Sequence, residues 1–183
     1  MLAYVFWHRP STGVAPAVYE VALGRFHEAL AESPPSGFRH SLAFRIAGAP
    51  WLTGEGYEDW YVLDGSQALD PLDRAAVTSA AGVRHDAVAA LAADGTGGLY
   101  RLRAGQEALD GAASVAWHGK PSGVSYDELF ARLAPWTNGA GAGLWGRQMV
   151  LGPTPEFCLR APAPLELPAE LEPLAVFTTQ VWP

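Results

Sequence analysis

Along the first part of the chain, the spacing of apolar residues alternates between that typical of β-strands and that typical of amphipathic helices. Residues 3–8 form a short run rich in aromatic and β-branched side chains, which predicts a strand. Apolar side chains then recur at helical spacing from Tyr19 to Leu30, before Pro34 and Pro35 end the expected helix. Further on, the pattern predicts strands at residues 37–46, 59–63 and 99–103, and a helix from residue 70 to about residue 93 that is broken at Gly82. The order β-α-β-β-α-β is that of a ferredoxin-like unit.

The second part of the chain repeats this order in a shorter form. The expected elements are a strand at 114–118, a helix at 125–135, strands at 143–151 and 157–160, and a final strand at 174–182. The prolines between residues 161 and 173 allow at most a turn of helix where the first part has its second helix. We therefore expect a reduced second copy that has lost this helix.

Similarity between the two parts supports a duplication. Residues 3–10 are echoed by residues 113–121, and both segments contain a Trp-His pair, at Trp7-His8 and Trp117-His118. Coincidence in an alanine-rich sequence is the alternative. The matches keep their order along the chain, which favours two repeats, residues 1–108 and 109–183, that together form one compact unit.

Two such units in one polypeptide, each opening with a Trp-His strand, resemble the dimeric α+β barrel superfamily in its fused, pseudo-dimeric form. The resemblance implies an α+β fold in which two antiparallel sheets pack face to face and helices cover the outside. Members of the superfamily include cofactor-free monooxygenases, isomerases, haem-dependent enzymes and proteins with no assigned reaction. No motif in this sequence selects one of these activities, and fold alone does not settle function.

Charge and composition narrow the classes of partner. The 183 residues include 12 Lys and Arg against 19 Asp and Glu, a net charge of -7, which disfavours binding to nucleic acid or to an anionic membrane. Cys158 is the only cysteine, so an intramolecular disulfide is excluded. Residues 1–10 lack the layout of a signal peptide, and we expect a cytoplasmic protein. It is expected to be a monomer (a pseudo-dimer) or a homodimer that binds a small molecule.

Strand alternation places a candidate pocket. In the first strand of each repeat, one face carries Ala3, Val5 and Trp7 or Ala113, Val115 and Trp117, and we expect this face to pack against the helices. The other face would point between the two sheets and carries Tyr4, Phe6 and His8 or Ser114, Ala116 and His118. Because the second set is smaller, we predict a ligand-binding gap there. The alternative is that Tyr4 and Phe6, or the tryptophans nearby, fill it.

Histidines are the candidate catalytic residues, because imidazole can act as an acid or a base near neutral pH. The candidates are His8, His40 and His118. His8 and His118 could instead hydrogen-bond loop carbonyls and hold the strand-to-helix turn, and His40 could be part of a core face. His27 is expected at the surface.

Other candidates for ligand contact are charged or aromatic. Arg39 and Arg147 are expected to point to solvent, to pair with acids such as Asp59 on a neighbouring strand, or to reach an acidic ligand. Trp60 lies in the segment 54–61, whose glycines, acids and aromatics could close over a pocket or form an ordinary hairpin loop.

No sequence motif indicates a cofactor or a metal. Zinc, calcium and phosphate-loop motifs are absent, so we predict no metal site. His85 beside Asp86 is expected to be a solvated helix residue, with haem ligation as the alternative that the resemblance offers. The leading hypothesis is a small-molecule-binding protein without an assigned activity. The alternatives are a cofactor-free monooxygenase or isomerase that uses a pocket histidine, a haem-dependent enzyme, and an interaction scaffold.

Overall fold

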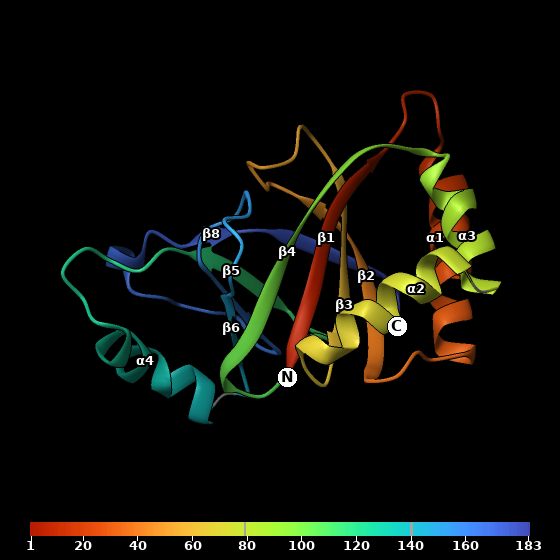
Figure 1. Cartoon of the computed structure of the whole chain (residues 1–183). Helices are drawn as coiled ribbons and strands as arrows, with labels where there is room; N and C mark the ends of the chain where they lie inside the picture. The colour runs from red at the N-terminus through yellow and green to blue at the C-terminus, as the bar shows by residue number, and fades with distance from the viewer. Residues whose placement is uncertain (79, 140) are drawn as a thin grey trace.

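The computed structural model describes residues 1–78, 80–139 and 141–183, and its elements largely follow the predicted order (Figure 1). The first part comprises β1 (Leu2–Pro10), α1 (Pro16–Glu32), β2 (Phe38–Ala47), β3 (Gly56–Leu63), α2 (Leu69–Thr78), α3 (Ala80–Ala89) and β4 (Ala92–Gly105). The second part comprises β5 (Ser114–His118), α4 (Tyr126–Ala134), β6 (Gly143–Arg147), β7 (Phe157–Ala161), β8 (Leu174–Ala175) and β9 (Phe177–Trp182). Within the described ranges, no helix is both long and apolar enough to cross a membrane.

The strands of the described residues form one antiparallel sheet with the order β8-β5-β7-β6-β4-β1-β3-β2-β9. The two end strands, β8 and β9, follow each other in the chain but pair at opposite edges of the sheet. Ala175 of β8 pairs with Ala116 of β5, and Phe177 of β9 pairs with Ala47 of β2. The segment 174–182, predicted as one strand, therefore passes from one edge of the sheet to the other. The sheet is thereby nearly closed into a barrel, which leaves few unpaired strand edges.

The two parts of the chain contribute strands in the same internal order. The first gives β4-β1-β3-β2 and the second gives β8-β5-β7-β6, so each opening strand lies between the fourth and the third strand of its part. In the first part His8 lies opposite Tyr57, and in the second part His118 lies opposite Phe157. These pairs define which positions of the two parts correspond.

Four tryptophans fill the interior of the barrel, where the sequence predicts a pocket. Trp7, Trp60, Trp117 and Trp145 are fully buried, and the rings of Trp7 and Trp117 meet edge-on with centroids 5.7 Å apart. Buried aliphatic side chains from both parts pack around them. The predicted position of the pocket, between the two halves of the sheet, is therefore wrong.

The predicted assignment of the two faces of the first strand is also wrong. Ala3, Val5 and Trp7 belong to the barrel interior, whereas Tyr4 and Phe6 pack with side chains of α1, α2 and α3. Alternation establishes which residues share a face of a strand. It does not establish which face the helices cover when both faces are largely apolar, as they are here.

A buried ion pair crosses the barrel interior. Arg160 Nη1 lies 2.9 Å from Glu58 Oε1, and both side chains are fully buried. The indole N–H groups of Trp7 and Trp60 also donate to the Glu58 carboxylate, at 2.8 Å and 2.7 Å. The Arg160 guanidinium lies over the Phe44 ring, 4.3 Å from its centroid. The glutamate is therefore held by three N–H donors in a site closed to water.

The helices cover the outer face of the sheet unevenly. α1, α2 and α3 cover the part formed by β1 to β4, and α4 lies over the second part (Figure 1). Gly82, where the sequence predicts a break, lies within α3. A Cβ at Gly82 would lie 3.0 Å from the Val77 carbonyl carbon, so this glycine lets α3 approach α2 closely.

Candidate functional site

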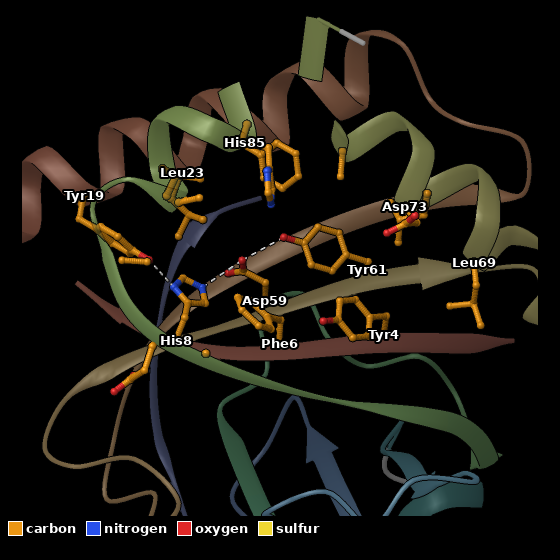
Figure 2. A pocket seen from close by; sticks show the side chains of 18 of the residues that line it. Tyr4, Phe6, His8, Tyr19, Leu23, Asp59, Tyr61, Leu69, Asp73 and His85 are labelled. Atoms are coloured by element: carbon orange, nitrogen blue, oxygen red, sulfur yellow. Dashed lines mark hydrogen bonds and ion pairs between the residues drawn. The ribbon is translucent and has the colours of Figure 1, made fainter. Parts of the chain in front are cut away.

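A cavity of about 570 Å³ lies between the outer face of the sheet and α1, α2 and α3 (Figure 2). Its walls are mainly aliphatic and aromatic. The sheet contributes Tyr4, Phe6 and His8 from β1, and Asp59 and Tyr61 from β3. Because alternate residues of a strand share a face, these five side chains point together toward the helices. They form the floor of the cavity.

His8 is held between two polar side chains. Its Nδ1 lies 2.6 Å from the Tyr19 hydroxyl, and its Nε2 lies 3.1 Å from Asp59 Oδ2. Tyr19 comes from the first turns of α1, and Asp59 lies opposite Phe6 in β3, diagonal to His8. The ring is buried and has a polar neighbour at each nitrogen, so its orientation is well defined.

A second histidine reaches the same carboxylate. His27 Nε2 lies 3.5 Å from Asp59 Oδ2, and its Nδ1 lies 2.7 Å from the Ser41 hydroxyl. The ring stacks on Tyr61, with centroids 5.3 Å apart, and is fully buried. The prediction that His27 lies at the surface is wrong because Trp182 of β9 also stacks on its ring, and the pattern of α1 alone does not reveal that cover.

Asp59 is the electrostatic centre of the floor. Its side chain is buried, and burial alone would raise its pKa, but the nearby His8 and His27 imidazoles outweigh burial and hold that pKa below its usual range. The Tyr61 hydroxyl donates to Oδ2 at 3.0 Å, and burial together with Asp59 raises the pKa of Tyr61. Within the described part of the chain, Oδ1 has no hydrogen-bond partner.

Glycines in β4 give the floor its shape. Gly95 lies opposite His8 and Gly97 lies opposite Phe6. A Cβ at Gly95 would lie 2.2 Å from the Phe6 ring, and one at Gly97 would lie 2.7 Å from the Tyr4 ring. Both aromatic rings therefore lean across β4 in space that only glycine leaves open.

Comparison with known proteins shows no family for this chain. No family model matches the sequence. No curated protein matches it significantly. Among solved structures, one similar chain is a protein provisionally described as a chlorite dismutase, with a TM-score of 0.43 and 15% sequence identity. The likeness covers 89% of this chain and 81% of that chain. At this level it assigns no chemistry to the protein.

The polar floor is confined to the first part of the chain. In the corresponding register of β5 and β7, Leu159 occupies the position of Asp59 and Ala161 that of Tyr61. Ser114 and Ala116 correspond to Tyr4 and Phe6 on the outer face of β5, and they do not line the cavity. The cavity therefore lies beside the larger residues, Tyr4 and Phe6, and not beside the smaller Ser114 and Ala116.

The three candidate histidines have different surroundings. His8 lines the cavity, as described above. His118 Nδ1 donates to the Gly119 carbonyl at 3.0 Å, which is the structural contact considered as its alternative role. His40 is half-exposed and forms an ion pair with Glu107. His40 and His118 are not among the residues that line the cavity.

The remaining candidates for ligand contact also lie elsewhere. Arg39 pairs with Asp64 at the surface, with 3.3 Å between Nη1 and Oδ1. Arg147 donates to the carbonyl of Thr154 at 2.6 Å. Trp60 is buried in the barrel interior and does not line the cavity. Their predicted roles in ligand binding remain untested, but the structure does not bring them to His8.

Several residues of the cavity were missed by reasoning from the sequence. Asp59 and Tyr61 fall on one face of β3, and alternation through Tyr57-Glu58-Asp59-Trp60-Tyr61 is the signal that could have found them. His85, expected to be a solvated helix residue, lies at the cavity beside Phe26 with ring centroids 5.5 Å apart. That contact joins two helices, so no local pattern predicts it.

Among the described residues, the lining offers no metal-binding cluster and no cation to pair with a haem propionate. In the residues that the structure describes, no group of three or more His, Cys, Asp or Glu side chains is arranged to hold a metal ion. A haem would need an available axial ligand and cations for its propionates. His8 has a polar neighbour at each nitrogen, which leaves His85 as the lining histidine that could serve as an axial ligand. The exposed lining residues Asp70 and Asp73 are acidic. Within the described chain, no Lys or Arg lines the cavity.

We expect Tyr19→Phe to lower the free energy of unfolding by about 1–2 kcal/mol, because it leaves His8 Nδ1 buried without its partner. Urea unfolding at pH 7 measures the change. The matched control is Tyr126→Phe, which removes an exposed hydroxyl that donates to Glu156 at 2.8 Å and should leave stability unchanged. Equal effects of the two substitutions would contradict the role given to the Tyr19–His8 contact.

Proposed function

We propose that the protein binds a small, mainly apolar organic molecule in the cavity beneath α1, α2 and α3. The observation that carries the proposal is the convergence of His8, Asp59 and Tyr61 on the floor of a cavity whose walls are mainly apolar. A volume of about 570 Å³ is typical of ligand sites, which place a few polar groups among many apolar ones. The unpartnered Oδ1 of Asp59 supports the proposal, because a buried carboxylate oxygen is stabilised by a donor.

We also propose that the fold arose from two ferredoxin-like units, of which the second is reduced. The shared strand order β4-β1-β3-β2 and β8-β5-β7-β6 supports this interpretation, and so does the matching register of the two opening strands. On this view, one copy keeps the helices and the polar floor that make a site. The other copy has Leu159 and Ala161 in place of Asp59 and Tyr61 and contributes to the barrel.

A second candidate function is cofactor-free acid–base catalysis in the same cavity. It is favoured by the chain of contacts from Tyr19 through His8 to Asp59, in which the carboxylate can stabilise the protonated imidazole. A His8→Asn variant distinguishes the two functions. Under the catalytic alternative, it would still bind a compound that the wild-type protein converts, but would no longer convert it.

Binding can be tested with N-phenyl-1-naphthylamine, a neutral aromatic dye whose fluorescence rises in apolar surroundings. We expect saturable binding to the wild-type protein and an affinity at least about tenfold lower for Ala76→Trp, because the indole would occupy the cavity beside α2. Fluorescence titration measures both dissociation constants. Circular dichroism and urea unfolding establish that the variant is folded.

The matched control is Ala131→Trp, which places the same side chain on an exposed position of α4, away from the cavity. It should bind the dye as the wild-type protein does. Equal binding by wild-type protein, Ala76→Trp and Ala131→Trp would show that the dye binds elsewhere, and it would overturn the proposal.

A further inference from the structure

We propose that the ligand of this cavity is an organic cation, a protonated amine carried on an aromatic or aliphatic body. This inference rests on the proposed function and adds the charge of the ligand to it. Apart from His8 and His85, the charged lining is acidic, with Asp59 on the floor and Asp70, Asp73 and Asp94 around it, and no Lys or Arg lines the cavity in the described part of the chain. An anionic ligand would meet like charge from several sides.

The acidic residues around the floor differ in whether a basic side chain forms an ion pair with them. Asp94 is paired with Arg9, whose Nε donates to Oδ1 at 3.2 Å. Asp70 and Asp73 are exposed, and no ion pair joins either of them to another described residue. Both belong to α2, so their negative charge lies along one side of the cavity. A cation entering there would be attracted at short range, and the attraction would weaken as salt is added.

The floor gives an independent indication of the ligand. Oδ1 of the buried Asp59 lacks a hydrogen-bond partner among the described residues, whereas Oδ2 is contacted by Tyr61 and both histidines. A carboxylate only accepts hydrogen bonds, so the group that would satisfy Oδ1 must donate one. An ammonium group donates and also carries the opposite charge. This requirement does not depend on the acids of α2.

Aromatic rings complete the environment that a cation needs. Tyr4 stacks on Phe6 and on Tyr61, with centroids 6.2 Å and 5.9 Å apart, and all three rings lie on the floor next to Asp59 (Figure 2). The faces of aromatic rings attract cations, and an apolar ligand body packs against the same faces. Carboxylate and aromatic groups together therefore favour an amine over a neutral or an anionic molecule of equal size.

Three probes of similar shape test the sign of the charge. They are 2-phenylethylamine, a cation at pH 7, 2-phenylethanol, which is neutral, and 3-phenylpropanoate, an anion. Each competes with N-phenyl-1-naphthylamine for the wild-type protein in low salt. We expect the amine to displace the dye at a concentration at least about tenfold lower than the alcohol, and the carboxylate to displace none.

Two variants locate the effect. Asp59→Asn should weaken the amine about tenfold and weaken the alcohol less. Asp73→Asn should weaken the amine about threefold and leave displacement by the alcohol unchanged. Asp127→Asn, an exposed change on α4, is the matched control and should alter no affinity. Asp73 is exposed, so its variant remains informative if Asp59→Asn does not fold.

The outcomes separate this inference from the proposed function. If the dye binds in the cavity but the alcohol or the carboxylate displaces it as well as the amine does, the inference of a cation is overturned and the proposed function stands. The same holds if Asp73→Asn and a folded Asp59→Asn both bind the amine normally. If the dye binds wild-type protein and Ala76→Trp equally, the proposed function fails and the inference fails with it.

Discussion

Replacement of Glu58 by glutamine is expected to lower the free energy of unfolding by about 3–5 kcal/mol. The substitution preserves the shape of the side chain but removes the charge that balances Arg160 in the barrel interior. An amide also turns a donor toward Trp7, Trp60 or Arg160, all of which donate to the carboxylate. Urea unfolding followed by tryptophan fluorescence measures the loss, with circular dichroism as a second probe.

A double variant tests whether the unbalanced charge of Arg160 causes this loss of stability. Adding Arg160→Met to Glu58→Gln removes the unbalanced charge, and we expect it to recover about half of the lost stability or more. The surface pair provides the matched control, since Asp64→Asn breaks the contact of Arg39 with Asp64 and should cost less than about 1 kcal/mol. A loss for Glu58→Gln as small as that of the control would show that the buried pair does not stabilise the fold.

The positions of most elements can be predicted because the helices have a regularly spaced apolar face and the strands are short apolar runs between turn residues. The strand at 114–118 and the helix after Ser125 are found where the pattern places them, and a reciprocal Ser125–Glu128 capping box begins the helix. Closure of the sheet could not be predicted. Residues 174–182 read as one strand, but the change of partner at Val176 depends on where two distant edges lie in space.

The candidate site could be predicted only in part. Tyr4, Phe6 and His8 were correctly grouped on one face, but their side of the sheet was assigned wrongly because both faces of β1 are apolar enough to be buried. The buried contacts of Asp59 and His27 join β3 and α1, which are separated by β2 in the chain. Such contacts follow from tertiary packing, and periodicity within one element carries no information about them.

The stability of the protein is expected to depend on Asp59 in acid. Because the native pKa of Asp59 lies below its usual range, its carboxylate stays ionised in the folded protein at a pH where the unfolded chain, with a pKa of about 3.9, binds a proton. The unfolded state therefore binds more protons, and the free energy of unfolding must fall as pH falls below about 4. The contribution is fully present above that pH. Urea unfolding between pH 7 and pH 2 should show a steeper decline for the wild-type protein than for Asp59→Asn.

At pH 7 the same variant should be less stable than the wild-type protein by about 1–3 kcal/mol, because an amide loses the contacts of the carboxylate with His8 and His27 and turns one donor toward Tyr61 or an imidazole. The two curves should then approach each other in acid, where the wild-type carboxylate loses its advantage. Asp73→Asn removes an exposed carboxylate and should reproduce the wild-type curve. Parallel curves for wild-type protein and Asp59→Asn would contradict the assignment, because they would mean that Asp59 titrates alike in the folded and unfolded chains.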